Sequence, residues 1–140
     1  MTNKENKERL EELEEAIDQL NERGLPIIVE GDRDIAALMR IGVTAPLIKI
    51  NQGVSLMVFC EQVAERYKEV IILTDWDRKG HELMGKLRRD LQSCEVKADT
   101  VTRLEMFNIC RPECREVEAI DSLLERLKAP KPLRLKRDAW

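Results

Sequence analysis

Acidic residues stand directly after two short apolar stretches of the 140-residue chain. Glu30 follows the stretch 27–29, and Asp75 and Asp77 come just after the stretch 70–73. In an open parallel sheet, ligands bind beyond the carboxyl ends of the strands, so these acids would share one edge. Carboxylates that are crowded together repel one another unless a cation binds or one of them keeps a proton. Because oxygen ligands favour Mg²⁺ over zinc, the three acids are predicted ligands of Mg²⁺, with Mn²⁺ as an alternative.

Other acids nearby have a structural interpretation. Asp32 and Asp34 are well placed to cap the helix that follows them, and Asp77 could cap a helix beginning near Gly80. Glu30 is harder to explain structurally, because a glutamate that ends an apolar strand gains nothing from packing there. The functional interpretation is therefore strongest for Glu30 and for the acids as a set.

The elements that must position these acids alternate along the chain. Short apolar runs predict strands at 27–29, 46–50 and 70–73, with a weaker one at 95–101. Helical spacing of apolar residues predicts helices at 4–23, around 35–39, and over 54–67, 80–93 and parts of 103–127. This alternation predicts an α/β fold: a four-stranded, mainly parallel sheet of order 2-1-3-4, with helices on both faces and an extra N-terminal helix.

The chain divides into three predicted parts. Residues 1–24 form a helix packed on the domain, residues 25–127 form the domain itself, and residues 128–140 form a basic, proline-containing tail. The net charge of −3 excludes a uniformly basic coat but not a local nucleic-acid site. No apolar run is long enough to span a membrane, and no signal peptide is recognisable at the start. These features predict a soluble, cytoplasmic protein without a membrane partner.

The four cysteines do not form a recognisable metal-binding or disulfide pattern. Cys110 and Cys114 are spaced as half of a zinc site, but the second half is missing and His81 is the only histidine. Reduced, partly buried thiols are the favoured interpretation. A disulfide stays open as an alternative, and so does metal ligation.

The two acidic motifs resemble those of the Toprim domain, a metal-binding module of topoisomerases, primases, certain nucleases and recombination mediators. The first motif is Val29-Glu30-Gly31 with Asp34 shortly after, and the second is DxDxxG at Asp75, Asp77 and Gly80. The resemblance covers about residues 25–120. In size the chain is similar to the small stand-alone Toprim proteins of archaea and to the bacterial nuclease that matures the smallest ribosomal RNA.

The resemblance implies a role for each motif residue. Glu30 would be the general acid or base, or a metal ligand in nuclease-like members, and Asp75 and Asp77 would bind Mg²⁺. Asp32 departs from the pattern, because it stands where relatives often carry lysine. Tyr67 is the only tyrosine and lies far from both motifs in the sequence, which argues against topoisomerase activity.

The predicted function is Mg²⁺-dependent chemistry on nucleic-acid phosphodiesters, and a nuclease is the favoured form of it. Arg33, Arg78 and Lys79 lie in or after the motif loops and are predicted to contact DNA or RNA. Trp76 is predicted either to stack on a base or to pack against the loop. The alternative is a non-catalytic nucleic-acid or protein-binding module of the recombination-mediator type. A phosphatase of the haloacid-dehalogenase type ranks third, because its DxD lies on the first strand.

Three matters stay open from the sequence alone. Glu118 could approach the acidic cluster from the C-terminal region, although exposure on a helix surface is the simpler interpretation. His81 is more simply a surface histidine than a group that moves protons. A homodimer or a protein partner is compatible with the sequence, which does not distinguish between them.

Overall fold

The computed structural model describes residues 2–129. The helices are α1 (Asn3–Arg23), α2 (Asp32–Arg40), α3 (Leu56–Ala64), α4 (Arg78–Ser93), α5 (Val101–Cys110) and α6 (Ile120–Lys128), with a short 3₁₀ helix, η1 (Val117–Ala119), before α6. The strands are β1 (Ile27–Val29), β2 (Leu47–Lys49), β3 (Glu69–Ile72) and β4 (Lys97–Asp99).

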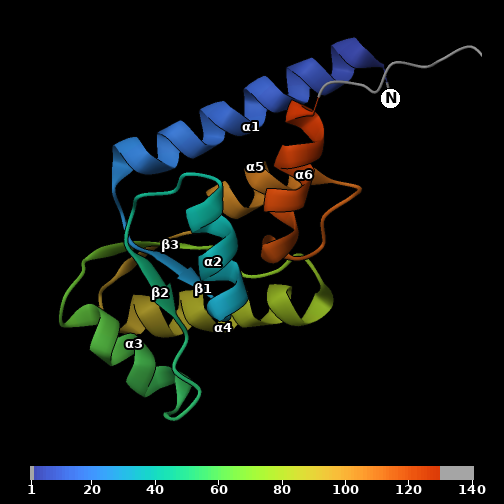
Figure 1. The fold of residues 1–140 in the computed structure, drawn as a ribbon. Coiled ribbons are helices and arrows are strands. Elements are labelled where there is room, and N and C mark those ends of the chain that lie inside the picture. Colours follow the sequence, from blue (N-terminus) through green and yellow to red (C-terminus); the bar gives the residue numbers. More distant parts are fainter. Residues whose placement is uncertain (1, 130–140) are drawn as a thin grey trace, which may run out of the picture.

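The four strands form one parallel sheet of order β2-β1-β3-β4. The predicted fold class and strand order are confirmed, and β1 and β3, which precede the two acidic motifs, are neighbours. The fourth strand is shorter than the predicted 95–101, and α3 begins at Leu56 because Ser55 caps it with its hydroxyl. The parallel arrangement directs the ends of β1 and β3 toward the same edge (Figure 1).

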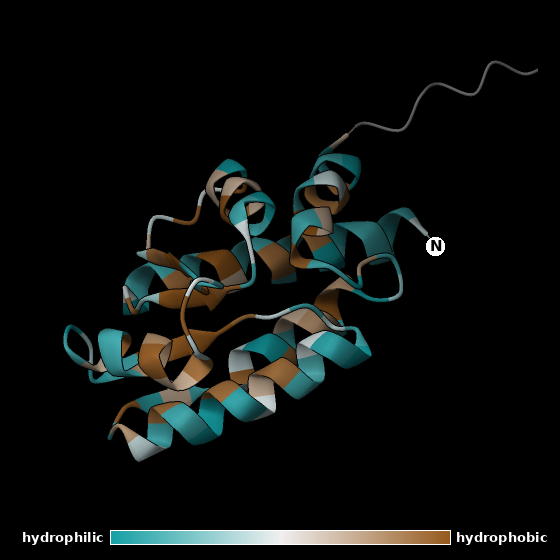
Figure 2. Ribbon diagram, turned by 90° about the horizontal axis from the view of Figure 1, so that it is seen from below, coloured by the Kyte–Doolittle hydropathy of each residue, from teal (hydrophilic) through white to brown (hydrophobic). Residues whose placement is uncertain are grey.

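Alternate strand residues pack against opposite helical layers. Ile27 and Val29 face a core built with α1, α2, α5 and α6, whereas Ile28 faces a second core built with α3 and α4. The strands are buried on both sides, as expected for a parallel sheet covered by helices. Figure 2 shows the hydrophobic colouring concentrated on the strands and on the inner faces of the helices.

The N-terminal helix α1 lies across the outside of the first layer (Figure 1). Its apolar residues Leu13, Ile17 and Leu20 are buried in the same core as α5 and α6. Thr2 and Glu5 form a capping box at its start, and Gly24, with φ of 61°, ends it in the left-handed conformation that favours glycine. Among residues 2–129, no helix is both long and apolar enough to cross a membrane.

Helix α1 ends at Arg23 and α6 at Lys128, and the division of the chain at residues 24 and 127 stays a prediction. Most of the predicted basic tail, residues 130–140, lies outside the described residues.

Candidate functional site

The carboxylate of Glu30 and the backbone of Asp75 are in direct contact. Oε2 of Glu30 accepts a hydrogen bond of 2.7 Å from the backbone N–H of Asp75. Oδ1 of Asp75 in turn accepts a bond of 2.8 Å from the backbone N–H of Val117, just before α6. Neighbouring strands therefore bring the two acids together at the sheet edge, and a segment 42 residues further along the chain completes the arrangement.

Asp77 stands at the start of α4. It is the N-cap of that helix, and its Oδ1 accepts a 2.7 Å hydrogen bond from the N–H of Gly80. A Cβ placed on Gly80 would lie 2.0 Å from the carbonyl oxygen of Asp75, so only glycine allows α4 to begin this close to the loop. The spacing of the DxDxxG motif is thus explained by the turn itself, independently of any metal.

Burial and crowding change the protonation of the site. Burial raises the pKa of Asp75 to about 6, the Val117 amide opposes the shift, and the charges of Glu30 and Asp77 add to it. The proximity of the Glu30 side chain therefore favours the protonated form of Asp75. Exposed Glu116 has a raised pKa, first through its hydrogen bond to Glu118 and then through the charge of Asp75.

The two other acids of the first motif differ from each other. Asp34 is 6% exposed and its Oδ2 accepts a 3.1 Å bond from the N–H of Gly31, the N-cap of α2. Burial, followed by the charges of Asp75 and Glu118, raises the pKa of Asp34. Asp32 is exposed in the first turn of α2 instead of capping it.

A lysine from the neighbouring strand approaches Asp32. Nζ of Lys49, the last residue of β2, lies 3.1 Å from a carboxylate oxygen of Asp32. Asp32 stands where relatives often carry a lysine, and Lys49 supplies a positive charge next to that position from β2. Nothing in the sequence around Lys49 distinguishes it, because the proximity depends on the pairing of β1 with β2.

Arg103, which no sequence motif indicated, is the one buried cationic side chain among residues 2–129. Its Nε donates a 3.0 Å hydrogen bond to the carbonyl of Thr74, and its Nη2 donates to the carbonyl of Asp75. The sequence hint of a special role for Arg103 is that it is the single arginine of α5 and lies on the buried face of that helix. The two carbonyls that it contacts are separated from it by 28 and 29 residues along the chain.

Trp76 packs against α5. Its indole N–H donates to the carbonyl of Arg103 at 2.8 Å, and its ring stacks on Phe107 with ring centroids 5.9 Å apart. The packing alternative is therefore the one that the structure shows for this residue. His81 is exposed on α4, next to but not within the carboxylate group.

The predicted nucleic-acid contacts are all exposed. Arg33 lies in the first turn of α2, and Arg78 and Lys79 begin α4, so all three flank the carboxylates. The side chain of Arg78 is 94% exposed and forms only a surface ion pair with Glu82. A pair this exposed contributes little to stability, which leaves Arg78 available for a polyanion.

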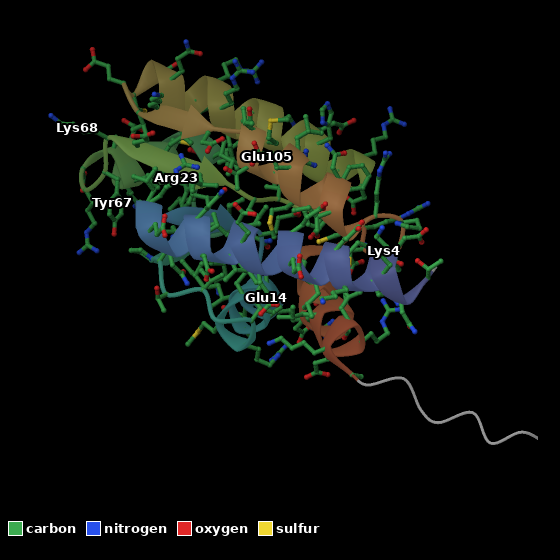
Figure 3. The ribbon with its side chains drawn as sticks, turned by 90° about the horizontal axis from the view of Figure 1, so that it is seen from above. Lys4, Glu14, Arg23, Tyr67, Lys68 and Glu105 are labelled. Atoms are coloured by element: carbon green, nitrogen blue, oxygen red, sulfur yellow. The ribbon has the colours of Figure 1, made fainter. Side chains whose placement is uncertain are left out.

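The cysteines do not contribute to the site. Cys110 and Cys114 are buried free thiols, and Sγ of Cys114 donates a weak hydrogen bond of 3.6 Å to the carbonyl of Ala119. Tyr67 lies before β3, at the opposite end of that strand from Asp75, and Figure 3 shows it beside Lys68 at one end of the molecule. That position is consistent with the argument against topoisomerase activity.

The donor chemistry of Glu30, Asp75 and Asp77 suits a hard divalent cation. All three offer oxygen, and each has a second carboxylate oxygen besides the one bonded to a backbone amide. A bound cation would relieve the repulsion between these carboxylates. Within residues 2–129, no three His, Cys, Asp or Glu side chains already surround a metal position, so binding requires side-chain rotation.

Comparisons with known proteins agree with this geometry. The Toprim domain model matches residues 26–109, more than half of the chain. A UPF0292 protein of Pyrococcus horikoshii is 42% identical over 111 residues, covering 79% of this chain and 83% of that protein. A UPF0292 protein of Methanosarcina barkeri is 36% identical over 135 residues, covering 94% of both chains.

A solved structure of a putative protein from Aquifex aeolicus also has a similar fold. Its TM-score is 0.61 at 26% identity, and the match covers 74% of this chain and 94% of that one. Toprim domains are associated with divalent metal ions and with nucleic-acid metabolism, and the two motifs that carry the resemblance lie together at the sheet edge. The chain belongs to the Toprim domain family.

Proposed function

We propose that this protein is a Mg²⁺-dependent enzyme that cleaves nucleic-acid phosphodiesters. The observation that carries the proposal is the contact between the Glu30 carboxylate and the backbone of Asp75, which unites two separate motifs. Burial first, and then the crowding of its charge with those of Glu30 and Asp77, raises the pKa of Asp75, so its ionised form is disfavoured in the absence of a cation. A site that tolerates such crowding is typical of functional positions.

Each residue has a distinct role in this proposal. Asp75 and Asp77 hold the cation from positions two residues apart on one loop, and Glu30 either completes the ligand set or accepts a proton from the attacking group. When bound, Mg²⁺ neutralises phosphate charge and lowers the pKa of a coordinated water. Mn²⁺, with similar ligand preferences, is expected to substitute for it.

The surface charge favours one approach for a nucleic acid. Residues 4–23, which lie within α1, carry eight acidic and four basic side chains. Glu14 on α1 and Glu105 on α5 are both exposed on the face seen in Figure 3. That face repels a polyanion. Arg33, Arg78 and Lys79 instead surround the carboxylates, so the backbone of the nucleic acid would bind across the sheet edge.

The test is cleavage of defined DNA and RNA, single- and double-stranded, with Mg²⁺ or Mn²⁺. Glu30→Gln, Asp75→Asn and Asp77→Asn should each abolish most cleavage, and their combined loss should be far from additive because the three act as one unit. Asp32→Asn is the matched control, since it removes an exposed acid at the same edge. If Asp34→Asn were the more damaging change and Asp75→Asn harmless, the assignment would be wrong.

A second candidate is a binding module without catalysis. The observation that favours it is that all three carboxylates accept hydrogen bonds from backbone amides, so each one also stabilises the loops. This candidate predicts nucleic-acid or protein binding without cleavage under any metal condition. Arg78→Ala and Lys79→Ala should weaken nucleic-acid binding and reduce its salt dependence under both candidates.

A further inference from the structure

Arg103 has an unusual position for a cation. The residue is 8% exposed, and its guanidinium donates hydrogen bonds to the backbone of the β3–α4 loop. The carbonyls of Thr74 and Asp75, which it contacts, lie beyond the last residue of β4 that pairs with β3. The guanidinium therefore donates hydrogen bonds to backbone carbonyls that no longer have a partner in a neighbouring strand.

The contacts around this loop are reciprocal. Arg103 donates from its side chain to the loop, and its own carbonyl accepts the indole N–H of Trp76. On the other side, the hydroxyl of Thr74 donates a 2.7 Å bond to the carbonyl of Gly80. The backbone from which Asp75 and Asp77 project is thus held between α4 and α5.

The guanidinium also faces the acids electrostatically. Burial lowers the pKa of Arg103, and the charges of Glu30, Asp75 and Asp77 oppose that shift. The charge of Arg103 and its hydrogen bonds to the loop have opposite effects on the binding of a cation. A fixed positive charge repels a metal ion, whereas a fixed loop keeps two of its ligands in place.

We propose that Arg103 is the positioning residue of the carboxylate site, and that its two hydrogen bonds to the backbone at Thr74 and Asp75 set the affinity for a divalent cation. This inference depends on the proposed metal site and extends it. Residues that orient metal ligands from behind typically change metal affinity by about 10- to 100-fold when they are altered. We expect the positioning effect to exceed the electrostatic one, because both hydrogen bonds of the guanidinium go to the backbone that carries Asp75.

Two substitutions separate position from charge. Arg103→Lys keeps the positive charge but cannot reach both carbonyls in the geometry of a planar fork. Arg103→Met removes both the fork and the charge. The matched control is Arg9→Lys, because Arg9 also donates two hydrogen bonds to a backbone carbonyl, that of Ile109, but does so away from the carboxylates.

The measurement is Mn²⁺ binding, followed by the electron paramagnetic resonance signal of the free ion, with Mg²⁺ as the competitor. Melting temperatures are recorded for the same samples, and binding is measured well below each of them. Arg103→Lys and Arg103→Met should both weaken Mn²⁺ binding, by about tenfold or more. Arg9→Lys should lower the melting temperature but leave Mn²⁺ affinity within about twofold, as expected for an independent site.

Several results would overturn the assignment. If Arg103→Lys binds Mn²⁺ like the unaltered protein while Arg103→Met binds it more tightly, only the charge matters. If both variants lose thermal stability but keep their affinity, or if neither folds, Arg103 serves the fold alone. If the unaltered protein and Asp75→Asn bind Mn²⁺ equally, Asp75 is not a metal ligand. The proposed function then fails at its metal site, whatever the Arg103 variants show.

Discussion

The β1–α2 turn and the β3–α4 loop both place acids at the same edge of the sheet, but they are held in different ways. In the first, Asp34 bonds to the amide of Gly31 three residues earlier, so the turn is organised locally. In the second, Asp75 and its neighbours contact Arg103, Arg115 and Val117, which are distant in sequence. The local turn follows from short-range rules, whereas the loop depends on the whole tertiary fold.

The glycines of the two segments show the same contrast. Gly80 has the carbonyl of Asp75 in the position that a Cβ would occupy. Gly31 has an extended backbone with φ of −156°, and nothing lies within 4 Å of its virtual Cβ. The close backbone approach expected of a motif glycine is therefore present in the second motif only.

The largest predicted effect tests this difference between the glycines. Gly80→Ala should lower the free energy of unfolding by about 3 kcal/mol, because the added methyl group meets rigid backbone and α4 must move. Gly31→Ala should change it by no more than about 0.5 kcal/mol. Thermal or urea unfolding of the two variants measures both values. Equal losses in the two variants would contradict the contrast between the segments.

The next effect concerns Mg²⁺. For a site with a dissociation constant on the order of 1 mM, about 10 mM Mg²⁺ should stabilise the folded protein by roughly 1.4 kcal/mol. The melting temperature should rise by a few degrees, and Na⁺ at matched ionic strength should not reproduce the rise. Asp75→Asn and Asp77→Asn should reduce the response, and Asp32→Asn should not. An unchanged response in Asp75→Asn and Asp77→Asn would locate the ion elsewhere.

Helix capping provides a third, smaller test. Asp77→Ala should destabilise the protein by about 1 kcal/mol, because the N–H of Gly80 loses its acceptor at the start of α4. Asp77→Asn keeps an oxygen acceptor and should retain most of this stability. Asp32→Ala should have almost no effect, since Asp32 forms only an exposed ion pair with Lys49. Chemical denaturation without added metal is the measurement, and a loss in Asp32→Ala equal to that in Asp77→Ala would contradict it.

The strand order could be predicted from the sequence, because apolar runs alternate with helical patterns. The proximity of Glu30 and Asp75 could also be predicted, because parallel strands end at one edge of the sheet. The sequence was also sufficient for Asp77 as a cap, since a cap acts within one turn. It could not identify Arg103 or the amide of Val117, because their partners depend on how α5 and η1 pack. It could not decide the orientation of Trp76 for the same reason.

The last prediction compares the protonation of the two segments. Asp75 has a folded-state pKa of about 6, above the value near 3.9 of an unfolded chain, so the folded protein binds more protons between about pH 4 and 6. Stability from this group therefore falls as the pH rises through that window. With solvent screening of a half-buried carboxyl taken into account, the change should be on the order of 1 kcal/mol.

Asp75→Asn isolates this contribution, because the amide oxygen can still accept the hydrogen bond from Val117 while the ionisable group is removed. In the presence of a chelator, the difference in unfolding free energy between Asp75→Asn and the unaltered protein should grow in favour of the variant from pH 4 to 7. Asp99, whose pKa is lowered by Arg23 and Thr102 despite its burial, should give the opposite sign, because its ionised form is the stabilised one. A flat difference for Asp75→Asn across this range would show that burial and the neighbouring charges do not raise the pKa of Asp75 in the folded protein.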